Sequence, residues 1–217
     1  MALFITFEGG EGCGKSVQAK ALYRRLSQLA IPALLTHEPG GTPLGKKLGR
    51  WLKWAEGTDM SPLTELLLFN ASRAQLVTKI IQPDLENGNV VICDRFADST
   101  TAYQGYGRGL DLEMVKAIND AATQGLKPNL TVLLDMPVEA GLARKRGKRR
   151  DRFEQEEIAF HHRVREGYLK LASDDPERWL VIDATQSKKK IAQIIWQRVS
   201  QLLSSQGESK RGFASLL

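Results

Sequence analysis

The chain has 217 residues, 42% of them hydrophobic, and a formal net charge of +6. This size suits a single domain around one core, and the sequence has no run of about 18 apolar residues that could span a bilayer. With two cysteines and no signal-peptide cleavage pattern, we expect a cytoplasmic protein without a disulfide, a metal-binding cysteine cluster or a membrane partner.

Strand and helix patterns alternate along the chain. In order, the sequence predicts a strand over residues 4–7, a helix over 18–29, a strand over 31–36, helices over 43–55 and 63–82, a strand over 90–94, a helix over 112–122, a strand over 130–134, helices over 138–145 and 154–172, a strand over 179–182 and a helix over 188–203. The later strands are almost continuously apolar, which is typical of parallel strands covered on both faces. The pattern predicts a doubly wound α/β fold, with a five-stranded parallel sheet and helices on both faces.

Helical spacing also suggests where some side chains lie. Trp51 and Trp54 share the spacing of apolar residues in their helix, so we expect them in the core. His161 and His162 lie in a charged helical stretch, and we expect them to face solvent. Residues 206–217 are polar and rich in Gly, Ser and Lys, which favours a flexible C-terminal tail after a single domain over residues 1–205.

Residues 9–16 form a phosphate-binding motif. Their sequence, Gly-Gly-Glu-Gly-Cys-Gly-Lys-Ser, fits GxxxxGK[ST] and lies between a predicted strand and a predicted helix, as the motif requires. Backbone N–H groups would hold phosphate oxygens, Lys15 would reach the β- and γ-phosphates, and Ser16 would ligate Mg²⁺; a purely structural glycine loop is the alternative. We therefore expect ATP to contact Gly9, Gly10, Glu11, Gly12, Cys13, Gly14, Lys15, Ser16 and Val17.

Asp94 ends the apolar strand over residues 90–94. Open α/β sheets bind their ligands at the carboxyl ends of the strands, so we expect Asp94 to emerge beside the phosphate-binding loop. There it can reach Mg²⁺ or the water shell of the ion, and Asp94 joins Ser16 as a predicted metal-binding residue. An aspartate that only caps the following helix is the alternative.

A basic stretch lies between two predicted helices. Residues 144–152 contain seven basic side chains and one acidic one, so they carry seven minus one, or +6, which equals the excess of the whole chain. Such dense like charges repel one another, but around a triphosphate they can close and neutralise charge on the transferred group. We expect an arginine-rich lid over about residues 143–154, with Arg144 contacting ATP; a solvated basic face or a nucleic-acid patch is the alternative.

Several further segments combine with the phosphate-binding loop: Glu38-Pro-Gly-Gly, Phe69-Asn-Ala-Ser-Arg73, Asp94-Arg95-Phe96, Asp98-Ser-Thr-Thr-Ala-Tyr-Gln-Gly105 and Asp151-Arg-Phe-Glu154. In this order and spacing, from Phe4 to about Ala184, the chain resembles thymidylate kinase. The resemblance implies a P-loop kinase fold with one nucleoside-monophosphate-kinase-like domain. It also implies ATP- and Mg²⁺-dependent phosphorylation of dTMP to dTDP for DNA precursor synthesis, and a homodimer.

The resemblance also implies roles for single residues. Phe69 would stack on thymine, and Arg73, one helical turn later, would donate to a base carbonyl. Tyr103 would occupy the space of a ribose 2′-hydroxyl, Glu11 would accept from the 3′-hydroxyl, and Arg95 would hold the acceptor phosphate. Without the resemblance, these would be a core aromatic, a surface arginine and ordinary loop residues. The implied dTMP-binding residues are Glu11, Glu38, Arg50, Phe69, Arg73, Arg95, Thr100, Tyr103 and Gln104.

The acceptor determines the mechanism that we expect. A nucleotide phosphate has a second pKa near 6 and is mostly a dianion at neutral pH, so in-line transfer needs no general base. Catalysis then depends on placement and charge, from Lys15, Arg95 and the lid. Family members carry the assisting arginine in the P-loop or in the lid. This P-loop has Cys13 and no arginine, so we expect Arg149 or Arg150 to act, with Arg144 behind them.

Two departures from the family pattern concern the acceptor. The residue before Glu-Pro-Gly-Gly is His37 where arginine is usual, and the next helix has Gly49 followed by Arg50 where an arginine usually contacts the acceptor phosphate. Arg50 is turned by about 100° around the helix relative to position 49. We expect that Arg50→Ala raises the KM for dTMP; an unchanged KM would show that Arg50 is not a ligand.

Two other functions remain open from the residues alone. A deoxynucleoside kinase must deprotonate a hydroxyl and needs a carboxylate base, for which Glu8 or Glu38 could serve. A DNA-binding P-loop ATPase would use the basic stretch to contact DNA, and its binding would weaken steeply with salt. We expect no stable nucleic-acid partner.

Overall fold

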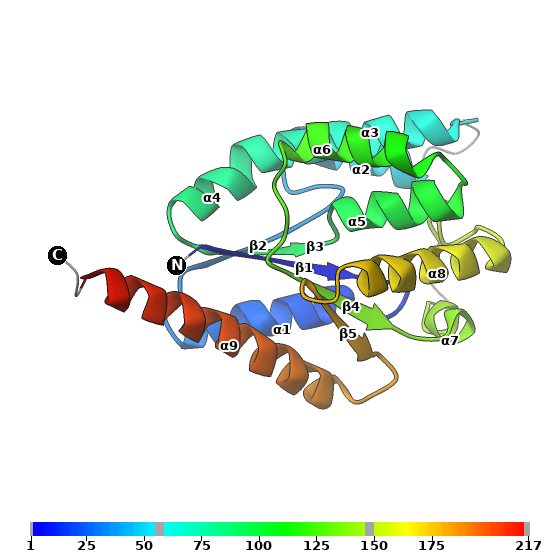
Figure 1. Cartoon of the computed structure of the whole chain (residues 1–217). Helices are drawn as coiled ribbons and strands as arrows, with labels where there is room; N and C mark the ends of the chain where they lie inside the picture. The colour runs from blue at the N-terminus through cyan, green and yellow to red at the C-terminus, as the bar shows by residue number, and fades with distance from the viewer. Residues whose placement is uncertain (1, 55–58, 146–149, 215–217) are drawn as a thin grey trace.

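A five-stranded parallel sheet forms the centre of the protein, as predicted (Figure 1). The computed structural model describes residues 2–54, 59–145 and 150–214. The strand order is β2-β3-β1-β4-β5, and every pairing is parallel. The strands are β1 (Leu3–Glu8), β2 (Ala33–His37), β3 (Val90–Asp94), β4 (Leu130–Asp135) and β5 (Trp179–Asp183).

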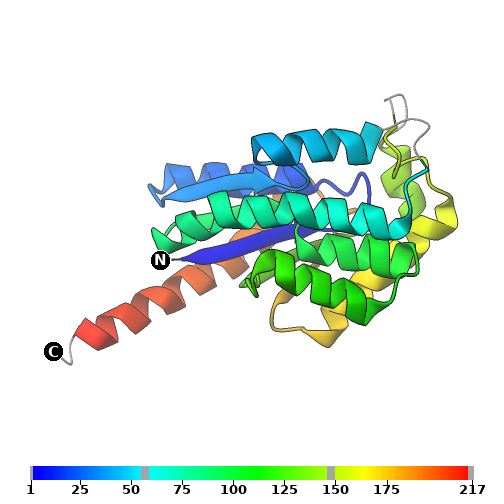
Figure 2. The same ribbon diagram turned by 90° about the horizontal axis from the view of Figure 1, so that it is seen from above.

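Helices cover both faces of the sheet, which confirms the doubly wound arrangement. In Figure 1, α2, α3 and α6 lie above the sheet, whereas α1 and α9 lie below it, and Figure 2 shows the upper helices side by side. The α-helices are α1 (Lys15–Gln28), α2 (Pro43–Trp54), α3 (Pro62–Leu76), α4 (Gln82–Glu86), α5 (Ala97–Thr100), α6 (Leu112–Thr123), α7 (Val138–Ala143), α8 (Ile158–Asp174) and α9 (Lys188–Ala214), and two π-helical segments are η1 (Val77–Ile81) and η2 (Thr101–Gly107).

The alternation of side chains along β1 divides the core into two parts. Leu3, Ile5 and Phe7 pack in the apolar cluster that contains residues of α1 and α9. Phe4 faces the opposite side and packs edge-on against Phe96, with ring centroids 4.9 Å apart. Since successive strand residues point to opposite faces, the last residue of β1, Glu8, points to the side of Phe4.

Some predicted boundaries were wrong. The helix predicted to end before Pro83 continues through η1 into α4, because a proline near the start of a helical segment loses no needed hydrogen bond. Residues 97–107, for which the sequence predicted neither helix nor strand, form α5 and η2. The helix predicted to end at residue 203 runs to Ala214, although Gly207 and Gly212 lie in the added part and glycine is a poor helix former.

Three expectations about burial were also wrong. Trp51 is 66% exposed and Trp54 is 38% exposed, so neither is a core residue. His161 is only 5% exposed, since it lies on the buried face of α8 beside Phe160.

Among the described residues, no helix combines the length and apolar character needed to cross a membrane.

Candidate active site

The loop between β1 and α1 wraps around the ammonium group of Lys15. Lys15 Nζ donates to the carbonyl oxygens of Gly9 at 2.9 Å and Gly10 at 2.7 Å. Gly14 takes the left-handed conformation that begins α1 directly after the loop. The loop is therefore preformed, with its cation at the centre and the positive end of the helix dipole behind it.

The phosphate-binding loop packs backbone to backbone against α7. A Cβ atom on Gly12 would lie 2.0 Å from the carbonyl oxygen of Gly141, and one on Gly141 would lie 2.3 Å from the carbonyl oxygen of Glu11. Gly12 also has a φ of 70°, which disfavours other residues. Only glycine at both positions permits this approach, and α7 leads directly into the basic stretch.

Asp94 lies beside the loop, because the sheet register pairs Phe7 of β1 with Asp94 of β3. Ser16 Oγ donates a hydrogen bond to Asp94 Oδ2, and both residues line the cavity described below. A hydroxyl and a carboxylate in contact are hard oxygen donors, which suit Mg²⁺. In the part of the chain that the structure describes, no cluster of three His, Cys, Asp or Glu residues could hold a metal, so phosphates and water would complete the shell of such an ion.

Arg95 is the centre of a hydrogen-bond network next to the loop. Its backbone has a φ of 72°, unusual for a residue with a side chain, so the local structure must hold it in place. Its guanidinium group connects the loop at Gly9 to Tyr103 and Tyr168 on the other side of the site. It donates to the Gly9 carbonyl at 3.2 Å, Ser99 Oγ at 3.3 Å, Tyr168 Oη at 3.2 Å, Glu11 Oε1 at 2.7 Å and Tyr103 Oη at 3.1 Å.

Two carboxylates near Arg95, the fully buried Glu8 and the 15% exposed Glu11, differ in their pKa values. Burial alone would raise the pKa of Glu11, but attraction to Arg95 and Lys15 and a hydrogen bond from Tyr103 lower it to about 2. Burial, followed by repulsion from Asp98, raises the pKa of Glu8 to about 7 despite Arg95. Glu11 is therefore a fixed anion in the site, whereas Glu8 titrates near neutral pH.

Arg73, predicted to contact a base, lies in a buried polar network. It is 1% exposed, and its Nε donates to Glu38 Oε2 at 2.9 Å. The other donors of the guanidinium are also used. They bond to Asn70 Oδ1 at 3.0 Å, Thr100 Oγ1 at 3.0 Å, Asn119 Oδ1 at 2.9 Å and the Phe96 carbonyl at 3.1 Å. Arg73 joins α3, α5 and α6 behind the cavity wall.

One cavity of about 800 Å³ runs from the phosphate-binding loop to Phe69 and Gln104. It brings together most of the predicted residues, which come from the ends of β1, β2 and β3, from α1 and α3, from the helical segment after β3 and from the residue after α7. Those that line it are Glu11, Gly12, Gly14, Lys15, Ser16, Val17, Glu38, Phe69, Asp94, Arg95, Thr100, Tyr103, Gln104 and Arg144.

Other predicted residues lie elsewhere. The cavity lining does not include Gly9, Gly10, Cys13, Arg50, Arg73 or Arg150, and Arg149 lies outside the described residues. Cys13 is 3% exposed and packs in the core cluster of α1 and α9, so an arginine side chain there could not enter the cavity without leaving that core. Arg50 is exposed on α2, whereas Lys53, one turn later on the same helix, lines the cavity.

The basic stretch is joined at its described ends. Lys145 Nζ contacts Glu154 Oε1 at 2.6 Å, which connects the residues on either side of the undescribed segment. Arg144 donates to the Ala184 carbonyl at 3.4 Å from each terminal nitrogen. Arg150 is exposed, and its carbonyl accepts from Gln155 Nε2 at 2.9 Å.

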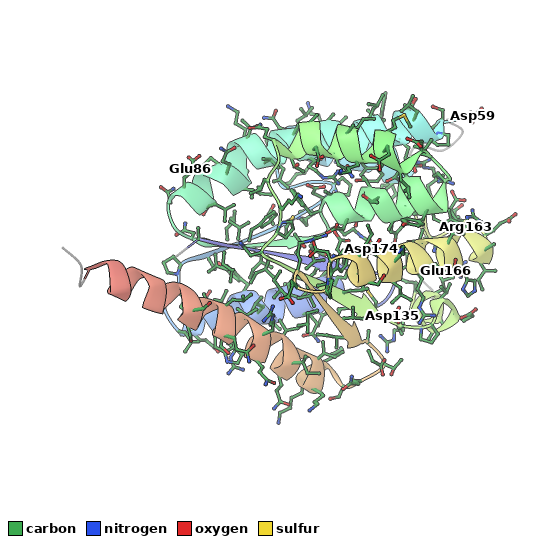
Figure 3. All side chains as sticks on the ribbon, in the orientation of Figure 1. Asp59, Glu86, Asp135, Arg163, Glu166 and Asp174 are labelled. Carbon is green, nitrogen blue, oxygen red and sulfur yellow. The ribbon has the colours of Figure 1, made fainter. Side chains whose placement is uncertain are left out.

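Sequence reasoning missed several residues that line or support the site. Lys53, Ser99 and Phe153 line the cavity, and Tyr168 donates to the Glu8 carboxylate at 2.8 Å. For Phe153 a signal existed, since it lies in the quoted Asp-Arg-Phe-Glu segment; its ring is 5.7 Å from that of Phe69. The helix α8 is anchored on this side by Arg165, which pairs with Asp135 at the end of β4 at 2.7 Å. Figure 3 labels Asp135.

A loop built to hold a triphosphate thus opens into a cavity with space for a second molecule beside Arg95. This is the arrangement of a P-loop kinase, an enzyme that passes a phosphoryl group between two bound substrates.

Similarity to known proteins shows which family of P-loop kinases the chain resembles. The thymidylate kinase family model matches residues 7–195. A thymidylate kinase from Dehalococcoides mccartyi (strain ATCC BAA-2266 / KCTC 15142 / 195) is 56% identical over 203 residues, 94% of this chain and 98% of that protein. One from Geotalea uraniireducens (strain Rf4) is 52% identical over 193 residues, 86% of this chain and 91% of that protein. The crystal structure of thymidylate kinase from Ehrlichia chaffeensis has a TM-score of 0.75 and 33% identity, covering 91% of this chain and 98% of that one.

The chain belongs to the thymidylate kinase family, which confirms the resemblance seen in the sequence. Its activity is the phosphorylation of dTMP, with ATP as the phosphate donor. The two alternative functions considered from the sequence, a deoxynucleoside kinase and a DNA-binding ATPase, are therefore set aside.

Proposed function

We propose that the chain transfers the γ-phosphoryl group of ATP directly to the 5′-phosphate of dTMP, in line and without a general base. The position of Arg95 carries this proposal, because its guanidinium group contacts both the loop at Gly9 and the acceptor side at Tyr103. The two carboxylates that could have served as general bases, Glu8 and Glu38, are hydrogen-bonded or ion-paired. Glu8 accepts from Phe96 N at 2.7 Å and Ser99 Oγ at 2.6 Å, and Glu38 pairs with Arg73 at 2.8 Å.

The dependence of kcat/KM on pH tests this mechanism. If the acceptor dianion attacks unaided, the acidic limb follows the second pKa of the nucleotide phosphate, near 6. Replacing dTMP with thymidine 5′-phosphorothioate, a more acidic acceptor, then moves that limb to lower pH. A limb that stays fixed for both acceptors would contradict the proposal, since it would report a titrating group of the enzyme.

We propose that Mg²⁺ binds at Ser16 and Asp94 together with the ATP phosphates. Their contacting oxygen atoms at the mouth of the loop support this assignment. When bound, the ion would neutralise phosphate charge during transfer. The residues of the chain would hold the phosphates and orient them: Lys15 beside the β- and γ-phosphates, and the loop amides around them.

We propose that lid arginines supply the remaining charge, with Arg149 and Arg150 as catalytic candidates and Arg144 as an ATP contact. Arg144 lines the cavity beside the Ala184 carbonyl, and the buried Cys13 leaves the loop without a cation at that position. Single alanine variants distinguish the roles. Replacing an arginine that acts on the transferred group lowers kcat by about 10³-fold, whereas replacing one that only binds ATP raises the KM for ATP.

We propose that dTMP binds between Phe69, Tyr103 and Gln104, with Thr100 and Glu38 in the same wall. These residues line one end of the cavity, and Glu11 and Arg95 lie between that end and the loop. Arg73 would then act from behind the wall, through Glu38 and Thr100. Arg50 is exposed on α2, so the cavity residue Lys53 is a better candidate to reach the acceptor phosphate from that helix.

We also propose a homodimer that forms through α2 and α3. Exposed apolar side chains lie on these adjacent helices, namely Leu44, Trp51, Leu63 and Leu67, with exposed fractions of 46%, 66%, 42% and 48%. An exposed apolar area of this kind fits a second copy of the chain better than water. A cytoplasmic location is proposed as well, supported by the two free and buried cysteines.

A further inference from the structure

A buried carboxylate lies directly behind the wall of the cavity. Glu65, in the first turn of α3, has a side chain that is 1% exposed and is not among the cavity-lining residues. Its Oε1 accepts a hydrogen bond from Gln104 Nε2 at 2.7 Å. Gln104 is itself 1% exposed and lines the cavity, so Glu65 touches the back of a residue whose front faces the ligand.

Two guanidinium groups hold Glu65 in place. Arg108 donates to Oε1 and to Oε2 at 3.2 Å each, and Arg152 donates to Oε2 at 2.5 Å. Arg152 is itself fixed, because its Nε donates to the carbonyl of Leu52 at 3.1 Å. A carboxylate that accepts three hydrogen bonds from two guanidinium groups has little freedom to rotate away from Gln104.

This contact determines which way the amide of Gln104 points. A carboxylate that pairs with two guanidinium groups can only accept hydrogen bonds, so the NH₂ of Gln104 must face it and the amide oxygen must face away. That oxygen, Oε1, is buried and has no hydrogen-bond partner among the described residues. An unpaired buried acceptor is unfavourable, and a ligand that donates to it removes the cost.

From this geometry we propose that Glu65 is a positioning residue that makes the base pocket select a pyrimidine with a ring N–H. Thymine carries a hydrogen on its ring nitrogen between the two carbonyls, which can donate to Gln104 Oε1. Cytosine has a lone pair at the same nitrogen and would meet the oxygen acceptor to acceptor. The proposal rests on the binding of dTMP in this cavity, and it assigns part of the discrimination to a residue that never touches the base.

The variant Glu65→Gln tests the proposal. The Oε2 position accepts from both Arg108 and Arg152, so it takes the new amide oxygen, and the new NH₂ takes the Oε1 position at the cost of one contact from Arg108 Nε. The NH₂ toward Gln104 then reverses the Gln104 amide, so that donors face the base. We expect the ratio of kcat/KM for dTMP to that for dCMP to fall at least tenfold, the loss typical of one hydrogen bond. The control is Glu156→Gln, because Glu156 also pairs with Arg108, at 2.6 Å, but has no hydrogen bond to Gln104; its ratio is expected to stay within about twofold.

A swapped pair provides a rescue that a merely structural role would not give. In the double variant Glu65→Gln with Gln104→Glu, the carboxylate at 104 accepts from the amide at 65 and again presents an oxygen to the base. We expect it to restore the preference for dTMP that Glu65→Gln loses. If Glu65→Gln is folded and keeps the wild-type ratio, or loses both substrates equally, the proposal is overturned.

Two further measurements keep the test decisive. If Glu65→Gln does not fold, Gln104→Met replaces it, since it removes the acceptor and keeps the volume; an unchanged ratio then overturns the proposal. The wild-type enzyme is measured in the same coupled assay. Failure of the wild type to phosphorylate dTMP would refute the function itself, whereas a wild-type preference for dTMP that Glu65→Gln leaves intact refutes only the role of Glu65.

Discussion

Replacing Glu8 by glutamine is expected to change how stability depends on pH. Glu8 is 0% exposed at the end of β1, and burial raises its pKa to about 7, from an ordinary value of 4.5. The folded state therefore binds a proton between these two pH values where the unfolded state has lost it. Since the folded state binds more protons in this window, its stability falls as pH rises.

The size of this effect follows from the same two values. Their difference of about 2.5 corresponds to about 3 kcal/mol of unfolding free energy, which is fully present as a penalty above pH 7 and absent below pH 4.5. Glutamine has no charge to bury. It can still accept from Phe96 N and donate to the hydroxyls of Ser99 and Tyr168, so the packing of the site is kept.

Urea unfolding of the wild type and Glu8→Gln from pH 4.5 to 8 measures the difference. We expect the stability of the variant relative to the wild type to rise by about 3 kcal/mol across this range. The control is Glu166→Gln on the outer face of α8 (Figure 3), an exposed position where the difference is expected to stay nearly constant. A constant difference for Glu8→Gln as well would refute the reasoning from burial.

Three further predictions concern other parts of the enzyme. Tyr103→Phe removes the hydroxyl that donates to Glu11 at 2.7 Å, and we expect kcat/KM for dTMP to fall about tenfold in a coupled assay, with KM for ATP unchanged. Gly141→Ala places a methyl group 2.3 Å from the Glu11 carbonyl oxygen; thermal unfolding is expected to show a loss of about 1–3 kcal/mol and steady-state assays a raised KM for ATP, and wild-type values for both would contradict the contact. Trp51→Glu is expected to give monomers by light scattering, whereas Leu169→Glu, 36% exposed on α8, leaves the mass unchanged; dimers of Trp51→Glu would exclude α2 from the interface.

The sheet and the phosphate-binding loop could be predicted because their signals are local. The apolar run from Val90 and the glycines from Gly9 each specify their own conformation, and parallel pairing brings Asp94 to the loop by register alone. The helical segment α5–η2 was missed because Gly105 and Gly107 resemble loop residues. Its stability comes from α8, whose Gly167 allows Tyr106 to approach closely.

Side-chain partners distant in sequence could not be predicted. The partners of Arg73 are an example, since Glu38 is 35 residues away and Asn119 is 46 residues away, and no spacing rule connects them. Trp51 shows the limit of helical periodicity, which finds an apolar face without showing what covers it. Glu65 gave no signal, since its role depends on two arginines brought together only by the fold.

The contact between Gly12 and Gly141 has a consequence for how the enzyme can vary in sequence. Most packing contacts change in small steps, as one side chain is exchanged for a slightly larger or smaller one. Here main chain meets main chain, and the smallest possible addition, one methyl group, already collides with a carbonyl oxygen. The distance between α7 and the phosphate-binding loop therefore cannot be adjusted in small steps at Gly12 or Gly141, and α7 leads directly into the basic stretch.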